Sequence, residues 1–364
     1  MIEFSGVGKQ YGDGMAAIES LDMTIATGEL TVLAGPSGCG KTTTLRLINR
    51  LEEATSGIVS IDGMDVRARE PTELRRSIGY VMQHSGLFPH RTVRDNIATV
   101  PHLLSWSKAQ IAQRVDELIE TVGLRTEIID RYPHQLSGGQ AQRVGVARAL
   151  AADPPILLMD EPFAAVDPIV RGRLQREFIQ LQEKVEKTIV FVTHDIDEAI
   201  SLGDRIALFE TGGRLAQYAP PADVLAAPAN GFVADFLGGE RELRRLALMR
   251  VAAVETEPGP EVTSDASSAS ALAAADRYGW SWVVIVGDDG QLIGWVACGD
   301  LIGGDSRIDE VVIQPFGQAV SADDTLRTAL GAIVTSPLGV VPRVDGARGY
   351  AGLVTHASLN QKLA

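Results

Sequence analysis

The most informative segment of this 364-residue sequence reads Gly35-Pro36-Ser37-Gly38-Cys39-Gly40-Lys41-Thr42. It matches the pattern G-x-x-x-x-G-K-[ST], in which glycines let the backbone wrap around phosphate groups with no Cβ atom in the way. An apolar run over residues 30–34 precedes it and a helical run over 43–50 follows it. The N–H groups of such a loop and of the helix start attract an anion. The segment predicts a phosphate-binding loop; a glycine-rich turn without a ligand is the alternative.

Two side chains of this loop suit a nucleoside triphosphate. Lys41 is expected to reach the β- and γ-phosphates, and the hydroxyl of Thr42 is expected to bind Mg²⁺. The predicted nucleotide-binding segment comprises Gly35, Pro36, Ser37, Gly38, Cys39, Gly40, Lys41, Thr42 and Thr43.

Further apolar runs indicate the sheet to which the loop belongs. Residues 156–159 and 188–192 are continuously apolar or β-branched, which is typical of strands buried on both faces of an α/β sheet. An amphipathic helix is predicted between them, over residues 173–187.

Two carboxylates end the run at 156–159. Ligands of α/β sheets bind at the carboxyl ends of the strands, where Asp160 and Glu161 would lie. We expect Asp160 to hold Mg²⁺, directly or through water, and Glu161 to act as general base on the attacking water. An ordinary acidic exit from a strand is the alternative.

A second anion-binding helix start is predicted at Leu136-Ser137-Gly138-Gly139-Gln140. One phosphate-binding loop has no use for two such cradles on the same phosphates. A head-to-tail dimer resolves this, because the motif would then cover ATP held by the other subunit. Taken alone, Ser-Gly-Gly is a common turn.

These motifs, together with His194 and in this order, resemble the nucleotide-binding domain of ABC transporters over about residues 1–237. The resemblance implies an α/β P-loop domain with a helical subdomain, ATP and Mg²⁺ as ligands, and a homodimer. It also implies that Leu136, Ser137, Gly138, Gly139 and Gln140 act in trans.

The resemblance assigns four further residues. Tyr11 would stack on adenine, and Gln83 would join Mg²⁺ to the permease contact, as both a metal-binding and a catalytic residue. Asp167 would line the dimer seam, and His194 would contact the γ-phosphate. Val166 departs from the family, which usually has leucine there. Without the resemblance, His194 would read as a structural histidine and Tyr11 as a core aromatic.

Segments between the motifs point to a cargo. Five of these segments together are similar to the ATPases of bacterial glycine betaine, carnitine, choline and proline uptake systems. They are Asn49-Arg50-Leu51 and residues 86–90, 100–104, 131–134 and 193–199. This implies permease subunits as partners and, indirectly, an extracytoplasmic solute-binding protein. Import of another small solute remains open, as does a soluble ABC ATPase that is not coupled to transport.

The remainder, residues 238–364, contains an internal repeat. Helices are predicted over 269–278 and 325–335, each followed by two strands around a turn, at 281–287 and 292–297 and at 339–344 and 349–354; residues 258–270 are predicted to be a loop. The two units resemble a pair of CBS modules, at about 243–303 and 304–364. Together they would form an α+β domain that is smaller than the nucleotide-binding domain.

Each module keeps half of the family's nucleotide-binding pattern. The first has Ala297 in place of the hydroxyl residue and keeps Asp300, and the second keeps Thr355 but has Ser358 in place of the acid. A regulatory nucleotide and a purely structural dimerisation role therefore both remain open.

Composition limits the classes of function. The net charge of −14 argues against a nucleic-acid partner, which would need a basic face. No apolar run approaches the roughly 18 residues of a membrane span, and the N-terminus lacks the features of a signal peptide. Cys39 and Cys298 are expected to stay reduced. We expect a peripheral protein on the cytoplasmic face of the plasma membrane, attached through its permease.

Overall fold

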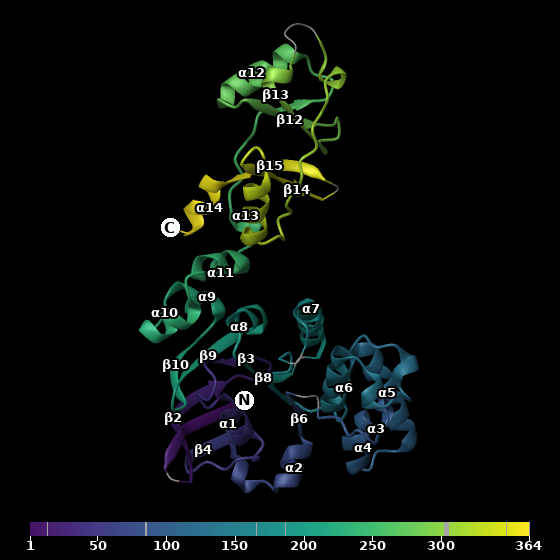
Figure 1. Ribbon diagram of the computed structural model, residues 1–364, viewed down its shortest axis with the longest axis vertical. Helices are drawn as coiled ribbons and strands as arrows, with labels where there is room; N and C mark the ends of the chain where they lie inside the picture. Colours follow the sequence, from purple (N-terminus) through teal and green to yellow (C-terminus); the bar gives the residue numbers. More distant parts are fainter. Residues whose placement is uncertain are drawn as a thin grey trace. The chain divides into compact units, whose positions relative to one another are not determined.

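The computed structural model describes residues 1–12, 14–83, 86–164, 166–185, 187–301, 306–346 and 348–363. The chain divides into two compact units, Met1–Gly238 and Gly239–Ala364 (Figure 1).

A six-stranded sheet forms the centre of the N-terminal unit. Its strands are parallel except for the edge strand β10, and their order is β10 (Arg214–Ala219), β9 (Arg205–Glu210), β3 (Leu30–Ala34), β8 (Thr188–Thr193), β7 (Ile156–Asp160) and β6 (Ile78–Val81). Every residue of β3, β7 and β8 is buried, as expected for strands covered on both faces. The three strands predicted from continuous apolar runs are thus confirmed.

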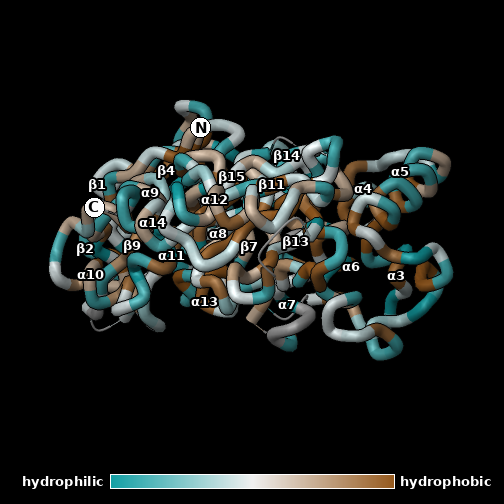
Figure 2. The backbone as a smooth tube through the Cα atoms, turned by 90° about the horizontal axis from the view of Figure 1, so that it is seen from above, coloured by the Kyte–Doolittle hydropathy of each residue, from teal (hydrophilic) through white to brown (hydrophobic). Residues whose placement is uncertain are grey.

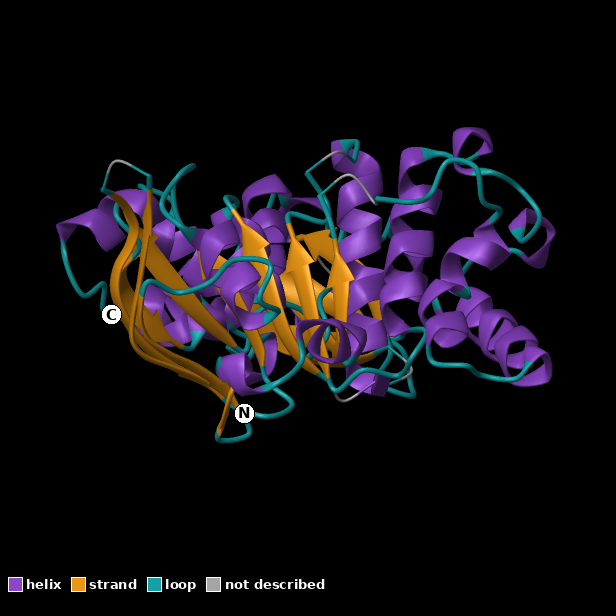
Figure 3. Cartoon of the chain, turned by 90° about the horizontal axis from the view of Figure 1, so that it is seen from below, coloured by secondary structure: helices purple, strands orange, loops and turns teal. Residues whose placement is uncertain are grey.

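A second, antiparallel sheet was not predicted. Its order is β2 (Met15–Ile25), β1 (Ile2–Tyr11), β4 (Ser56–Ile61) and β5 (Met64–Asp65). It shares one hydrophobic core with α1 (Lys41–Ile48) and the central sheet, in which Ile18, Leu45 and Phe209 are fully buried. Figure 3 shows this sheet at one end of the unit and a cluster of helices at the other.

The helical cluster follows β6 in the chain and includes α3 (Val93–Ile97), α4 (Thr99–Leu103), α5 (Lys108–Thr121) and α6 (Gly138–Leu150). The α6 helix packs against β6, α3 and α5. Hydrophobic and hydrophilic residues are interspersed along α5 (Figure 2), and its buried residues Ile111, Val115, Leu118 and Ile119 recur at the spacing expected of a helix with one buried face. The other helices of this unit are α2 (Pro71–Arg76), α7 (Pro168–Val185), α8 (Ile196–Leu202), α9 (Pro221–Ala226) and α10 (Gly231–Leu237).

Two predicted helices differ from the structure at their ends. The helix predicted over 43–50 begins at Lys41, directly after the glycine loop, and ends at Ile48. The one predicted over 173–187 begins five residues earlier, because Pro168 suits the first turn of a helix, where its missing N–H costs nothing. It ends at Val185, and Glu186 lies outside the described residues.

The C-terminal unit repeats one helix and one hairpin. Its first half contains α11 (Arg241–Leu248), β11 (Glu261–Thr263), α12 (Ser268–Tyr278), β12 (Trp282–Val286) and β13 (Leu292–Ala297); its second contains α13 (Leu326–Thr335), β14 (Val340–Asp345), β15 (Gly349–Thr355) and α14 (His356–Leu363). The predicted hairpins are confirmed. The predicted loop over 258–270 is wrong in part, because β11 joins the first hairpin in parallel and α12 begins at Ser268. The predicted module boundary at 303/304 lies outside the described residues.

Two further features concern membrane spans and the cysteines. None of the helices in the described part of the chain combines the length and apolar character that crossing a membrane requires. Cys39 and Cys298 are both free thiols.

Candidate active site

Parallel strands of the central sheet end at one edge, and a predicted site segment follows each of them. The register pairs Ala34 of β3 with Thr193 of β8, and Asp160 of β7 with Val192 of β8. Because β6 pairs in parallel with β7, its end lies at the same edge. The fold thereby brings together the loop at 35–42, His194, Asp160-Glu161 and Gln83.

The loop after β3 can be built only from glycine at two positions. Gly35 and Gly40 have φ values of 149° and 98°. A Cβ atom on Gly35 would lie 2.4 Å from the carbonyl oxygen of Phe209, and one on Gly40 would lie 2.4 Å from that of Ala17. The loop is therefore held tightly against its neighbours, and its backbone is exposed to a ligand without side chains between them.

Lys41 is buried inside this loop, with a relative exposure of 5%. Its Nζ atom donates to the carbonyl oxygens of Gly35 at 2.7 Å and Pro36 at 2.8 Å. Burial raises the pKa of the neighbouring Cys39 thiol, which keeps that group neutral. Among the described residues no carboxylate forms an ion pair with Lys41, so its charge is available to an anion.

Asp160 and Thr42 meet where β7 faces the start of α1. The Thr42 hydroxyl donates to Asp160 Oδ1 at 2.9 Å, and the Tyr80 hydroxyl lies 3.5 Å from Oδ2. Burial raises the pKa of the Asp160 carboxyl, and the hydrogen bond from Thr42 offsets part of that rise. A hydroxyl and a carboxylate are oxygen ligands of the kind that Mg²⁺ prefers.

Glu161 is the meeting point of three segments. Its Oε2 atom accepts from Gln83 Nε2 at 3.3 Å and lies 3.1 Å from His194 Nδ1. Its backbone has a φ of 43°, which is rare for a residue with a side chain, and its N–H donates to the carbonyl oxygen of Val192 at 3.1 Å. Such local strain is often found at functional sites. A carboxylate fixed in this way can accept a proton from water.

Glu198, on the first turn of α8, was missed by the sequence analysis. This carboxylate is 6% exposed; it accepts from the Thr193 hydroxyl at 2.6 Å and from Gln175 Nε2 of α7 at 3.0 Å. Burial raises its pKa. The Thr193 hydroxyl also accepts from the N–H of Asp195 at 3.0 Å, so Glu198 supports the turn that carries His194. The spacing of Asp195 and Glu198 matches a helix-capping pattern, which could have indicated it.

The segment at 136–140 lies apart from this edge. Ser137 caps α6: its Oγ atom accepts from the N–H of Gln140 at 3.3 Å, and Gln140 Oε1 accepts from its N–H at 3.0 Å. Among the described residues, the hydrogen bonds of Ser137 stay within this first turn, and Ser137 and Gly138 are exposed. Figure 1 shows α6 within the helical cluster, away from α1.

Tyr11 and Asp167 lie on the surface. Tyr11, at the end of β1, is 42% exposed, and Lys9 Nζ lies 4.7 Å from the centroid of its ring. Asp167 is exposed directly before α7, where its carbonyl oxygen accepts from the N–H of Arg171 at 2.8 Å.

In the second predicted CBS module, the two residues at the nucleotide-pattern positions, Thr355 and Ser358, already have hydrogen-bond partners within the chain. Thr355 Oγ1 donates to Glu257 Oε1 at 2.6 Å and accepts from the N–H of Ser358 at 3.1 Å. Ser358 Oγ in turn accepts from the N–H of Thr355 at 2.9 Å. In the first half, Ala297 and Asp300 lie at the end of β13 and in the short turn after it.

Comparison with known proteins places these features in a family. The family model described as "ABC transporter" matches residues 18–164. The osmoprotectant import ATP-binding protein OsmV of Salmonella typhimurium is 42% identical over 362 residues, which are 98% of this chain and 94% of that protein. The glycine betaine/carnitine/choline transport ATP-binding protein OpuCA of Bacillus subtilis is 43% identical over 363 residues, 99% of this chain and 95% of that protein.

A solved structure is similar in its fold to part of the chain. The dimeric structure of MJ0796, a bacterial ABC transporter cassette, has a TM-score of 0.55 and 34% sequence identity, and the match covers 61% of this chain and 99% of that one.

Proposed function

This chain belongs to the ABC transporter family as one of its ATP-binding subunits, and we propose that it hydrolyses ATP to power a permease that imports an osmoprotectant such as glycine betaine, choline, carnitine or proline. One observation carries the enzymatic part of this proposal. The phosphate-binding loop, the Asp160-Glu161 pair, Gln83 and His194 start from neighbouring strand ends at one edge of the central sheet.

The loop and the strand end after β7 would bind the nucleotide and its metal. The buried ammonium of Lys41 and the N–H groups at the start of α1 suit the β- and γ-phosphates. Thr42 and Asp160, with Gln83 nearby, would hold Mg²⁺, which supplies positive charge to the phosphates. A cation there would also favour the ionised form of Asp160, which burial alone disfavours. Tyr11 is an exposed ring on which adenine could stack.

Glu161 would act as the general base in hydrolysis. The contacts from Gln83 and His194 both reach Oε2, so they orient the carboxylate toward an attacking water. Glu161 takes the proton from that water, and His194, directly after β8, would contact the γ-phosphate.

The active form would be a homodimer. Ser137 and Gly138 are exposed at the start of a helix that lies apart from the chain's own phosphate loop, which supports use of Leu136, Ser137, Gly138, Gly139 and Gln140 by a second copy. Asp167, exposed ahead of α7, would line the seam.

Crosslinking tests the dimer. In a background carrying Cys39→Ala, Cys298→Ala and Glu161→Gln, the pair Ser37→Cys and Gly138→Cys should form a bridge between two chains when ATP is added. A bridge within one chain, seen as a monomer of altered mobility on a non-reducing gel, contradicts this arrangement. The variant with Ser37→Cys alone is the matched control and should not form the bridge.

The cargo rests on the relatives, since the solute does not need to touch an ATP-binding subunit. The test is ATP-dependent uptake of labelled glycine betaine, choline, carnitine and proline by proteoliposomes that contain the chain with its permease. Uptake of at least one of them in the wild type, and of none in a complex carrying Glu161→Gln, is the expected result. ATP hydrolysis without uptake of any of the four would support another small solute instead.

The C-terminal unit would be a pair of CBS modules that restrains or licenses transport. From Arg241 onward it carries 10 basic and 15 acidic residues, a net charge of −5. Interactions of such a surface weaken as salt rises, because the screening length falls from about 30 Å at 0.01 M to about 8 Å at physiological ionic strength. If this unit senses ionic strength or a nucleotide, a complex lacking residues 243–364 should keep hydrolysis and lose that response; an unchanged response would leave only a dimerisation role.

A further inference from the structure

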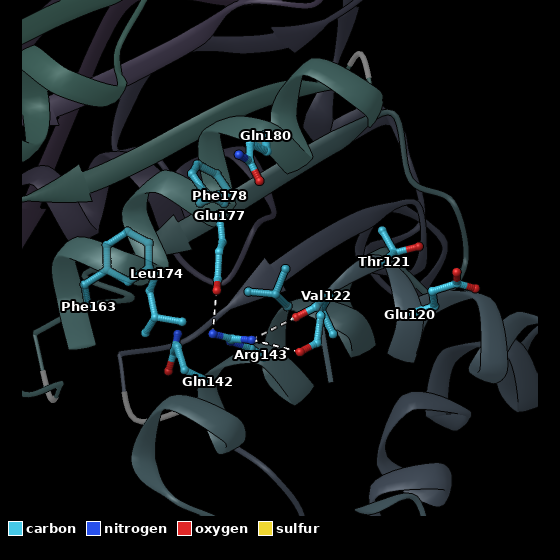
Figure 4. A pocket seen from close by; sticks show the side chains of 12 residues that line it. Glu120, Thr121, Val122, Gln142, Arg143, Phe163, Leu174, Glu177, Phe178 and Gln180 are labelled. Atoms are coloured by element: carbon cyan, nitrogen blue, oxygen red, sulfur yellow. Dashed lines mark hydrogen bonds and ion pairs between the residues drawn. The ribbon is translucent and has the colours of Figure 1, made fainter. Parts of the chain in front are cut away.

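A cavity of about 320 Å³ lies in the N-terminal unit, and its described lining includes none of the site residues named above. Its walls are α6, α7, the turn that follows α5, and Phe163 after β7 (Figure 4). This volume is within the range of pockets that bind small molecules.

The deeper wall of the cavity is apolar. Phe163 and Phe178 contact each other edge to face, with 6.2 Å between ring centroids, and Val146 and Leu174 extend the same surface. All four side chains are at most 7% exposed. A wall of this composition favours a ring or a compact aliphatic group over a charged one.

Two of the three charged side chains at the cavity neutralise each other; the third, Glu120, is exposed near the end of α5. Arg143 of α6 forms an ion pair with Glu177 of α7, and its Nη1 atom donates to the carbonyl oxygen of Gly123 at 3.0 Å (Figure 4). The pair spans from one helix to the other, so neither charge is left over for an ionic ligand. The cavity therefore suits an uncharged molecule.

One buried polar group in the cavity lacks a hydrogen-bond partner among the described residues. Gln142 of α6 is 5% exposed, and its Nε2 atom has no hydrogen-bond partner among the described residues. Leaving a buried donor unpaired costs about 1–3 kcal/mol. Figure 4 shows this amide between the two helices, directed toward Leu174 and Arg143. A ligand that offers one hydrogen-bond acceptor would satisfy it.

We propose that this cavity binds a small, uncharged, mostly apolar molecule with one hydrogen-bond acceptor such as a ketone or amide oxygen, and that its occupation slows ATP hydrolysis. The effect on hydrolysis follows from what the walls carry, and it rests on the function proposed above. The α6 helix begins at Ser137, α7 begins directly after Asp167, and Phe163 is two residues from Glu161. A molecule wedged among them fixes the spacing of segments that must close around the nucleotide.

The fluorescent ketone prodan is a suitable probe, because it is uncharged, has a naphthalene ring and a carbonyl acceptor, and changes its emission in an apolar site. Titration into the full chain should give saturable binding with a blue-shifted emission. The variant Gln142→Leu keeps the shape and removes the donor, so its dissociation constant should rise by about threefold to tenfold. Leu174→Trp fills the cavity and should weaken binding by more than tenfold. Gln113→Leu, the same chemical change on the exposed face of α5, is the matched control and should bind as the wild type does.

Hydrolysis supplies a second readout. Prodan should lower the turnover of the wild type, and the concentration for half-inhibition should shift in Gln142→Leu by the same factor as the dissociation constant. Absence of saturable binding, equal affinities in wild type and Gln142→Leu, or inhibition that does not follow binding would each overturn the proposal. If Leu174→Trp does not fold, as judged by its melting curve, Gln142→Leu decides. A wild type that does not hydrolyse ATP contradicts the proposed function, while the binding titrations still decide the site.

Discussion

The helices α1 and α14 each follow a strand, α1 after the loop at 35–40 and α14 with no residue between, and the N–H groups of their first turns have different partners. The α1 helix follows β3 with Gly40 at its cap, which has no side chain to occupy the N–H groups of the first turn, and Lys41 adds a positive charge. The α14 helix follows β15, where Thr355 and Ser358 exchange hydrogen bonds and the carboxylate of Glu257 accepts from Thr355.

The difference shows what a phosphate site requires. Free N–H groups at a helix start attract an anion. When neighbouring side chains already bond to those groups and a carboxylate lies beside them, an anion gains little and is repelled by the charge. A helix that follows a glycine-containing strand is therefore not enough to make a phosphate site, and at α14 the described hydrogen bonds of Thr355 and Ser358 are made within the chain.

The largest effect on ATP turnover is expected when a carboxylate near α1, that of Glu161, is replaced by an amide, and the same replacement near α14, at Glu257, serves as its counterpart. Glu161→Gln should lower the turnover of ATP by about 10²–10⁴-fold, because the amide can hydrogen-bond to water but cannot take its proton. ATP binding should persist. Glu257→Gln is the same chemical change beside α14 and should leave turnover unaltered. Steady-state phosphate release measures both, and normal turnover in Glu161→Gln would refute the role of that residue.

The second largest effect, on ATP binding, is expected from removing the positive charge of Lys41, which is present at the start of α1. Lys41→Ala should weaken ATP binding by about tenfold to a hundredfold, the value of a lost charge-assisted hydrogen bond. Isothermal calorimetry should give one ATP per chain for the wild type and a dissociation constant higher by this factor for the variant. Lys108→Ala, on exposed α5, is the control. A second ATP bound in the wild type, and retained in Lys41→Ala, would locate a nucleotide outside the α1 site and break the comparison.

A buried support of the catalytic edge should matter less. Glu198→Ala leaves Thr193 and Gln175 without their acceptor, so the free energy of unfolding should fall by about 1–3 kcal/mol. Because the turn carrying His194 loses its support, turnover should also fall while the KM for ATP stays the same. Glu198→Gln, whose amide oxygen can still accept from Thr193, should restore part of the turnover. Equal turnover in all three proteins would limit Glu198 to stability alone.

The smallest effect is expected at the start of α14. Ser358→Ala removes half of the reciprocal cap, which should cost about 1 kcal/mol of stability. Three of the four tryptophans, Trp280, Trp282 and Trp295, belong to the C-terminal unit, so denaturant unfolding followed by tryptophan fluorescence reports mainly on that unit. ATP turnover should not change; a loss of turnover would mean that this helix start takes part in catalysis.

Much of the catalytic edge could be predicted from the sequence, because its residues follow the strands that are easiest to recognise. Residues 30–34, 156–159 and 188–193 are apolar or β-branched and buried throughout, and the phosphate loop, the Asp160-Glu161 pair and His194 come immediately after them. When parallel strands are identified, the side chains at their carboxyl ends are known to lie together.

The features that escaped prediction depend on contacts between distant segments. Strands β1 and β2 are interrupted by several register shifts, which blur the period of two that marks a half-buried strand. Glu198 looks like a surface acid on a short helix, and only the packing of α7 against α8 buries it with Gln175. The cavity beside Gln142 has no sequence signature, since it is formed where four separate segments leave space between them.

The shared edge of the central strands also limits how the gene can change in length. One residue added within β7 or β8 would move everything after it by about 3.3 Å and turn each side chain to the opposite face of the sheet. Glu161 and His194 would then no longer meet. A residue added to the turns that enter these strands from the other edge, such as the one before Ile156, leaves their carboxyl ends in register. Natural insertions and engineered tags should therefore be tolerated before the amino ends of these strands, whereas insertions within the strands should abolish ATP hydrolysis.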